Sequence, residues 1–229
     1  MPRRYTDRKC SQAKLCFALR QTGAFGGKAM IDGKSNDWKG TGATQMRKLL
    51  EHKIQELEAK LMELPIVQYA WLDVSEIEFS EKVRHICRTE CPRYGTSWSC
   101  PPGVGTVEEC RHRCEAYSHV FVFTTIAEVQ DAANMEETLA TRSAHEAVTK
   151  EIQQMFQPYF GKTLAMSGES CAICEHCAYP SQPCRHPEQM LPCIEGYGII
   201  VPVLAERAGI EFMNGANVVT WFGIVLFME

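Results

Sequence analysis

The sequence contains no hydrophobic run long enough to cross a membrane. Its longest apolar stretch, residues 216–228, is shorter than the roughly 20 residues that a membrane-spanning helix needs, and it is predicted to be a buried strand. The first residues of the chain are basic, yet no apolar core follows them, so they lack the central region of a secretory signal peptide. These absences predict a cytoplasmic protein with no membrane partner.

An excess of positive charge is missing as well. The chain has 24 Lys and Arg against 28 Asp and Glu, a formal net charge of −4, with the two signs interspersed. No basic face for nucleic acid is therefore predicted. Walker loops, Rossmann glycine fingerprints and Ser-His-Asp arrangements are absent too, which leaves hydrolase and nucleotide-dependent functions without support.

The N-terminal part of the chain shows two different patterns. Residues 1–42 are basic, rich in Gly, Lys and Ser, and without a sustained period, so they predict a loosely ordered arm. From Met46 to Leu64 the apolar residues recur at steps of three and four, which predicts an amphipathic helix over 44–64 that Pro65 ends. Such a helix would pack on the domain or form a homodimer with a second copy.

Residues 43–229 are predicted to form one cysteine-rich domain. Patterns rich in β-formers predict strands, and amphipathic periods predict helices. A capping box at Thr106 and Glu109 marks one helix start, and Gly209 marks one helix end. The strands are expected at 66–73, 120–125, 162–166 and 218–227, and the helices at about 80–87, 107–117, 132–157 and 198–208. This alternation favours a layered α/β fold with both cysteine groups on loops at strand or helix ends.

Cysteine is the residue present in unusual number. In a chain without a secretory signal, the reducing cytosol favours metal ligands or catalytic thiols over disulfides. Metal binding is therefore the leading interpretation. The twelve cysteines are Cys10, Cys16, Cys87, Cys91, Cys100, Cys110, Cys114, Cys171, Cys174, Cys177, Cys184 and Cys193.

The second cysteine group carries the stronger signal. Cys171, Cys174 and Cys177 form a Cys-x2-Cys-x2-Cys run, and Cys184 follows as a more distant fourth thiol. A run of this kind places three thiolates on three irons of an iron–sulfur cluster, and a distant cysteine completes the set. The spacing to Cys184 differs from that of an ordinary ferredoxin. Zinc is the alternative, because four thiolates also satisfy a closed tetrahedral site.

The first cysteine group contains three thiols, Cys87, Cys91 and Cys100, in a loop that prolines stiffen. Three thiolates would leave one iron of a cluster with an open coordination site. Cys110 and Cys114 could complete the set because they share a helix face, but burial in the core is the favoured interpretation. The role of Cys193 is open. Cys10 and Cys16, in the arm, are the least indicated as ligands.

Several motifs together carry a resemblance to a known family. They are Tyr94-Gly95, Trp98-Ser-Cys-Pro-Pro102, the Cys171–Cys177 run with Cys184-Arg-His-Pro-Glu188, Glu195 before Gly198-Ile199, and Val219-Thr-Trp-Phe-Gly223. Over about residues 49–227 the chain resembles the family labelled predicted metal-binding protein, domain of unknown function 2284. The resemblance implies metal binding by the seven cysteines of the two groups and names no reaction. Cys193 stands where the family leads us to expect serine.

Two functions from different classes compete. The first is an iron–sulfur protein of anaerobic metabolism with one or two 4Fe–4S clusters, acting as a redox carrier for an acceptor protein or as an enzyme with an open iron site. The second is a non-enzymatic zinc-stapled or metal-delivery module that docks through the arm and the helix at 44–64. Side chains that would tune a cluster or bind an anion, or else simply pack, are Arg88, Arg93, Tyr94, Trp98, Tyr179, Arg185 and His186.

Overall fold

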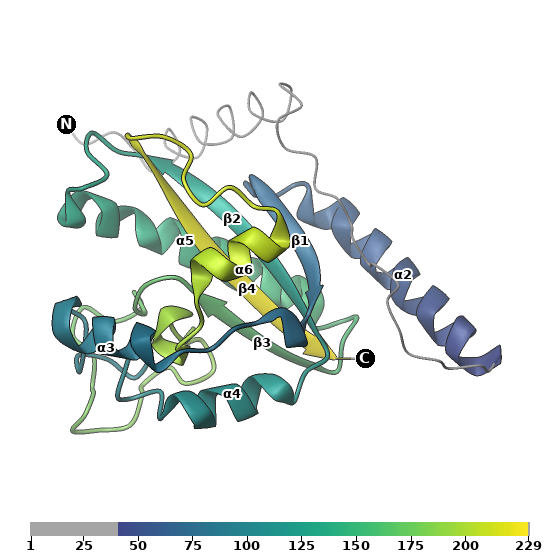
Figure 1. Ribbon diagram of the computed structural model, residues 1–229, viewed down its shortest axis with the longest axis horizontal. Helices are drawn as coiled ribbons and strands as arrows, with labels where there is room; N and C mark the ends of the chain where they lie inside the picture. The colour runs from purple at the N-terminus through teal and green to yellow at the C-terminus, as the bar shows by residue number, and fades with distance from the viewer. Residues whose placement is uncertain (1–40, 229) are drawn as a thin grey trace.

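The computed structural model describes the backbone of residues 41–228 and the side chains from residue 48 onward (Figure 1). The predicted arm, with Cys10 and Cys16, lies outside the described residues except for Thr41 and Gly42, which begin the first helix. In chain order the elements are α2 (Thr41–Leu61), β1 (Gln68–Asp73), the short 3-10 helix η1 (Val74–Glu76), α3 (Glu81–Glu90), α4 (Val107–Glu115), β2 (His119–Glu128), α5 (Met135–Phe156), β3 (Lys162–Ser167), the 3-10 helix η2 (Glu195–Tyr197), α6 (Val201–Ala208) and β4 (Val218–Met228).

The four predicted strands form one antiparallel sheet in the order β1-β2-β4-β3. Strand β2 is central, and Val122 lies opposite Ala70 on β1 and Ile224 on β4. Nearly every residue of β2 is buried. A strand covered on both faces does not alternate between polar and apolar side chains, which is why residues 120–123 form a continuous apolar run in the sequence.

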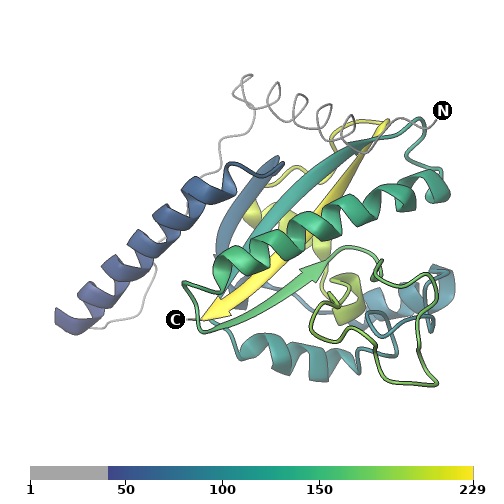
Figure 2. The same cartoon turned by 180° about the vertical axis from the view of Figure 1, so that it is seen from behind.

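Helices cover both faces of the sheet, so the predicted layered α/β class is confirmed. Helix α5 and the C-terminal half of α2 pack on one face, where Leu57 and Phe156 meet Phe121 and Phe227 (Figure 2). Helices α4 and α6 pack on the other face, where Leu204 belongs to the cluster around Ile224. The predicted apolar stripe of α2 thus packs in part on its own domain. A homodimer through residues 44–64 stays a prediction.

Helix ends follow the capping residues where the sequence provides them. Thr106 and Glu109 form the predicted capping box of α4, and Gly209 ends α6 in a left-handed conformation with φ +64°. Helix α5 begins at 135 rather than 132 because the Asn134 side chain accepts from the amides of Glu136 and Glu137. Helix α6 begins at 201 rather than 198, since Gly198 has φ +83° and cannot belong to a right-handed helix.

Both cysteine groups lie on loops that leave the ends of elements, as predicted. The first begins in the last turn of α3, and the second follows β3. In Figures 1 and 2 the loop after β3 runs beside α3. Two side-chain hydrogen bonds join the loops: Arg93 Nε donates to Ser170 Oγ at 2.7 Å, and Trp98 Nε1 donates to the Gln182 carbonyl at 3.0 Å. The two groups, distant in sequence, therefore form one region of the fold.

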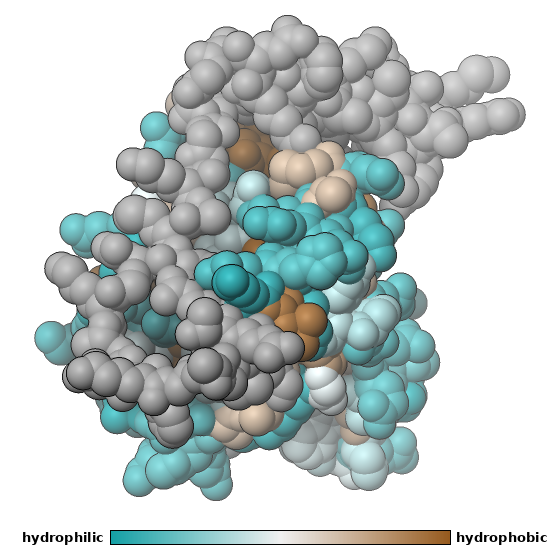
Figure 3. Space-filling view, turned by 90° about the vertical axis from the view of Figure 1, so that its right-hand side faces the viewer, coloured by the Kyte–Doolittle hydropathy of each residue, from teal (hydrophilic) through white to brown (hydrophobic). Residues whose placement is uncertain are grey.

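One face of the molecule shows how polar and apolar residues are distributed on its surface. On the face shown in Figure 3, the residues that are not grey are mostly hydrophilic, with small hydrophobic areas between them. Among the helices of residues 41–228, none has the length and apolar character needed to cross a membrane.

Candidate metal centre

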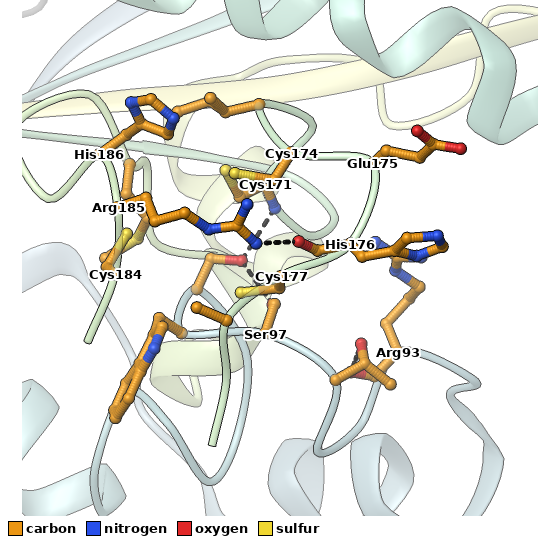
Figure 4. Close-up of a pocket in the computed structure, with 16 residues that line it drawn as sticks. Arg93, Ser97, Cys171, Cys174, Glu175, His176, Cys177, Cys184, Arg185 and His186 are labelled. Atoms are coloured by element: carbon orange, nitrogen blue, oxygen red, sulfur yellow. Dashed lines mark hydrogen bonds between the residues drawn. The ribbon is translucent and has the colours of Figure 1, made fainter. Parts of the chain in front are cut away.

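The second cysteine group opens onto one cavity of about 270 Å³ (Figure 4). The thiols of Cys171, Cys174, Cys177 and Cys184 all line it. The opposite wall comes from the first cysteine loop, through residues 96–99. The structure thus brings together the four cysteines that the spacing assigns to one site. That these four cysteines bind metal stays a prediction.

The start of the second loop is held by a series of hydrogen bonds. The Gly168 amide donates to the Phe222 carbonyl at 2.9 Å, and the Cys171 amide donates to Ser99 Oγ at 2.8 Å. The Ala172 amide donates to Glu146 Oε2, at 2.7 Å, and the other oxygen of that buried carboxylate pairs with Lys150. These contacts fix Cys171 against the sheet and against the first loop.

Backbone amides point at several of the cysteine sulfurs. The amides of Arg93 and Tyr94 donate to Cys91, and that of Ile173 donates to Cys171. Hydrogen bonds of this kind stabilise a thiolate and tune the reduction potential of an iron–sulfur cluster. Burial acts in the opposite direction and raises the pKa of Cys171 to about 11. A free thiolate is therefore disfavoured there, and a bound cation would restore it.

A positive side chain lies among the cysteines of the cavity. In Figure 4, Arg185 extends between the labelled thiols, and its guanidinium donates to the backbone oxygen of His176. Arg93, Trp98 and His186 line the same cavity. The Tyr179 ring packs edge-on against the Trp98 ring, with 4.9 Å between the ring centroids. These residues, singled out from the sequence, surround the candidate site.

The remaining residues singled out from the sequence lie elsewhere. Arg88 is exposed on α3, where its guanidinium forms a hydrogen bond with the His85 ring. The Tyr94 amide donates to the Cys91 carbonyl, within the first loop.

The first cysteine group lies on the other side of the segment 97–100. Cys87 is in the last turn of α3, Cys91 follows that helix as its C-cap, and Cys100 is buried. Burial, and then the neighbouring Cys91 thiolate, raises the pKa of Cys87 to about 11. Cys100 differs, because a hydrogen bond from Cys193 lowers its pKa to about 7. The three predicted thiols influence one another electrostatically, and Cys100 has a further neighbour, Cys193, for which the sequence predicted no role.

Cys110 and Cys114 are core residues, so the favoured interpretation of these two thiols is confirmed. Both are fully buried on α4, in the cluster that contains Val120 and Leu226. The Cys110 thiol donates to the Val104 carbonyl at 3.5 Å. Burial raises the pKa of Cys114 to about 12. Neither thiol completes the first cysteine group.

Two acidic residues near the cysteines were not predicted. Glu195 accepts a hydrogen bond from the Cys193 thiol at 3.1 Å. Glu169 has φ +64°, and of the residues from 41 to 228 it is the sole non-glycine residue with positive φ. Burial and then Glu195 raise the pKa of Glu169, which lies between the two groups. Glu195 stood in a family motif, but nothing in the sequence indicated Glu169, because its position follows from strand β3.

The spacing of the candidate ligands does not match a single bound ion. Within residues 48–228, no three His, Cys, Asp or Glu side chains converge closely enough to bind one metal ion. Four thiolates around one zinc, each about 2.3 Å from the metal, would have sulfurs only roughly 3.8 Å apart. The cysteines line a cavity instead of meeting at a point.

A layered α/β domain that collects two cysteine groups at one end defines a cysteine-rich candidate metal-binding protein. The chain belongs to the family described as predicted metal-binding protein (DUF2284), whose sequence model matches residues 70–227. The family resemblance is thus confirmed, although the match begins at β1 and leaves out α2. No curated protein and no solved structure matches the chain.

Proposed function

We propose that the chain binds a 4Fe–4S cluster in the cavity lined by Cys171, Cys174, Cys177 and Cys184, and that it is a redox protein of anaerobic cytoplasmic metabolism. One observation carries the proposal: four thiols with cluster-type spacing line a single cavity that a second loop closes. Membership in a metal-binding family supports the same site.

The size of the cavity favours a cluster over a lone ion. At about 270 Å³, it is about nine times the roughly 30 Å³ that a water molecule occupies in the liquid. A structural zinc leaves no such space, because its four ligands close around it. A cluster stands between its thiolates and holds them further apart, which agrees with cysteines that line a cavity without converging. The residues present therefore fit a cluster.

Each part of the site has a distinct task. The four thiolates hold the irons, and a bound cluster supplies one-electron transfer. The Arg185 guanidinium places a positive charge beside the thiolates, which offsets their negative charge and raises the reduction potential. Trp98 and Tyr179, in edge-on contact, shield the cavity from water. A redox carrier would need an acceptor protein at this exposed end of the domain.

The number of protein thiolates in the first cysteine group distinguishes a redox carrier from an enzyme. If Cys87, Cys91 and Cys100 hold a second cluster alone, one iron is open to an added ligand and chemistry beyond electron transfer becomes accessible. If a fourth protein thiolate is present, both centres are closed and electron transfer is the supported function.

The proposal is tested on full-length protein purified without oxygen. We expect iron and acid-labile sulfide in near-equal amounts and a brown colour, since zinc sites are colourless. Cys174→Ser should lose about four irons per chain, the content of one 4Fe–4S cluster. Cys114→Ser, which alters a buried thiol of the core, is the matched control and should keep its iron. Stoichiometric zinc without iron after anaerobic reconstitution would overturn the proposal.

A further inference from the structure

Cys193 lies at the junction of the two cysteine groups. It is buried between the end of β3 and η2, and it forms a β-bridge with Ser167. Its amide donates to the Ser99 carbonyl at 2.9 Å, which places it beside the residue that precedes Cys100. Because α3 packs against η2, Cys87 is brought to the same place from the other side. Cys87, Cys91, Cys100 and Cys193, from three separate segments, thus lie in one region of the fold.

The sulfur of Cys193 is held in a definite position. It donates to Glu195 Oε2 at 3.1 Å, accepts from the Gly196 amide at 3.3 Å, and is in hydrogen-bond contact with Cys100. A thiol carries one proton, so it cannot donate to Glu195 and Cys100 at the same time. The Cys193 sulfur thus lies within reach of both the Glu195 carboxylate and the Cys100 sulfur, which places it beside the first cysteine group.

Charged side chains lie around these thiols. Glu195 adds a negative charge next to Cys87, and Glu169 adds one next to Cys91. The cations that face this group are Arg84, which acts on Cys87, and Arg93 and Arg142, which act on Glu169. A metal centre would neutralise the rest.

We propose that Cys193 is the fourth thiolate of the group formed by Cys87, Cys91 and Cys100, which closes this group around a second 4Fe–4S centre. The assignment of a 4Fe–4S centre depends on the proposed function, whereas the proposal that Cys193 is a metal ligand does not. The closed set replaces the open iron site that three cysteines alone would leave, and it assigns the chain to electron transfer.

The two centres are separated by one short segment of chain. Ser99 accepts from the Cys171 amide through its side chain and from the Cys193 amide through its carbonyl. Ser97 and Ser99 line the cavity of the second group. The residue directly after Ser99 is Cys100, which belongs to the first group. Electrons can therefore pass between two centres that share residues 97–100 as a common wall.

Metal analysis of three variants tests the ligand set. Anaerobically reconstituted wild-type chain should contain about eight irons, and Cys193→Ser about half as many. Cys114→Ser, the matched buried thiol, should keep all of them. A Cys193→Ser variant that retains the wild-type content, while Cys87→Ser loses its second centre, overturns the proposal. If the wild-type chain contains zinc alone, the proposed function fails, and zinc loss from Cys193→Ser relative to Cys114→Ser still measures the ligand role.

Electron paramagnetic resonance of the reduced wild-type protein gives a test that does not depend on a variant folding. Two signals are expected, and neither should change when a small thiolate is added, because every iron already has a protein thiolate. A signal that shifts on addition of the thiolate shows an open iron and overturns the closed set. A spectrum of a single cluster in a chain that contains about four irons overturns it as well.

Discussion

His145 is a buried titratable residue outside the cysteine region. Its Nδ1 accepts from the Thr125 hydroxyl at 2.8 Å, and its Nε2 donates to the Phe222 carbonyl at 3.0 Å, so the neutral ring satisfies both partners. Burial lowers the pKa of His145 from 6.5 to about 4. The folded state therefore binds a proton less readily than the unfolded state. The contribution to stability is complete above pH 6.5 and is lost as the pH falls toward 4.

This asymmetry gives a prediction for acid stability. Between pH 6.5 and 5, the free energy of unfolding should fall by about 2 kcal/mol more in the wild-type protein than in His145→Gln, whose side chain does not titrate. Guanidinium unfolding curves at several pH values measure the difference, and the comparison removes the contribution of other groups. Parallel pH profiles for the two proteins would show that His145 is charged in the folded state.

At the residue scale, the sequence grouped candidate ligands where they are close together in the chain. Cys171, Cys174 and Cys177 lie within seven residues, so their spacing alone places them on one loop. Cys193 lies 93 residues after Cys100 in the chain, and the hydrogen bond from its amide to the Ser99 carbonyl brings the two together. No local pattern reports a contact of that kind, and so Cys193 had no predicted role.

Among the elements, β4 depends on a glycine at its centre. Gly223 is paired with Phe123 across the sheet, and the Phe123 ring lies where a Cβ at position 223 would be. That ring cannot move aside easily, because it is fully buried between Phe121 and His145. The close approach of ring and backbone therefore requires glycine at this position.

We expect Gly223→Ala to lower the free energy of unfolding by about 1–3 kcal/mol, the usual cost of overpacking a core. Thermal or denaturant unfolding measures it. Gly161→Ala is the control, since a methyl group there meets no atom within 4 Å. The double variant Gly223→Ala with Phe123→Leu should recover part of the loss. If Gly223→Ala unfolds like the control, the backbone of β4 has room that the structure does not show.

The region before α2 gives a second prediction at this scale. The metal-site contacts described above all lie between residues 84 and 222, and the sequence of the arm has no periodic apolar residues. Removal of residues 1–40 should therefore leave the iron and sulfide content unchanged. Leu57→Ala is the contrasting variant, because Leu57 is fully buried against the sheet and its truncation should cost about 2–5 kcal/mol. Loss of iron on removal of the arm would implicate Cys10 or Cys16 as ligands.

Element types and ends were predictable because they depend on residues that are near one another in the chain. The capping box at Thr106 and the stop at Gly209 were both identified correctly. The start of α6 was not, because the positive φ of Gly198 reflects packing: a Cβ there would meet Val107 of α4 and the Ser80 carbonyl. The start of α6 is therefore determined by contacts between elements that are distant in the sequence.

On the scale of the whole molecule, the alternation of strands and helices predicted layers but not the strand order. The order β1-β2-β4-β3 places the last strand between β2 and β3, a choice made by long-range packing on both faces. This order has a direct effect on the site. With β3 at the edge of the sheet, the loop after it is free to extend toward α3, where it meets the first cysteine loop.

The double attachment of Ser99 also bears on how the protein acquires its metal. The serine side chain restrains Cys171 of one group while its carbonyl restrains Cys193 of the other, so ordering either loop lowers the conformational entropy that remains to be lost at the second. If both proposed sites bind metal, binding at one therefore favours binding at the other, and the coupling is reciprocal. Chains with a single filled site would accordingly be scarce during assembly, and the protein would pass from empty to fully loaded as one cooperative unit.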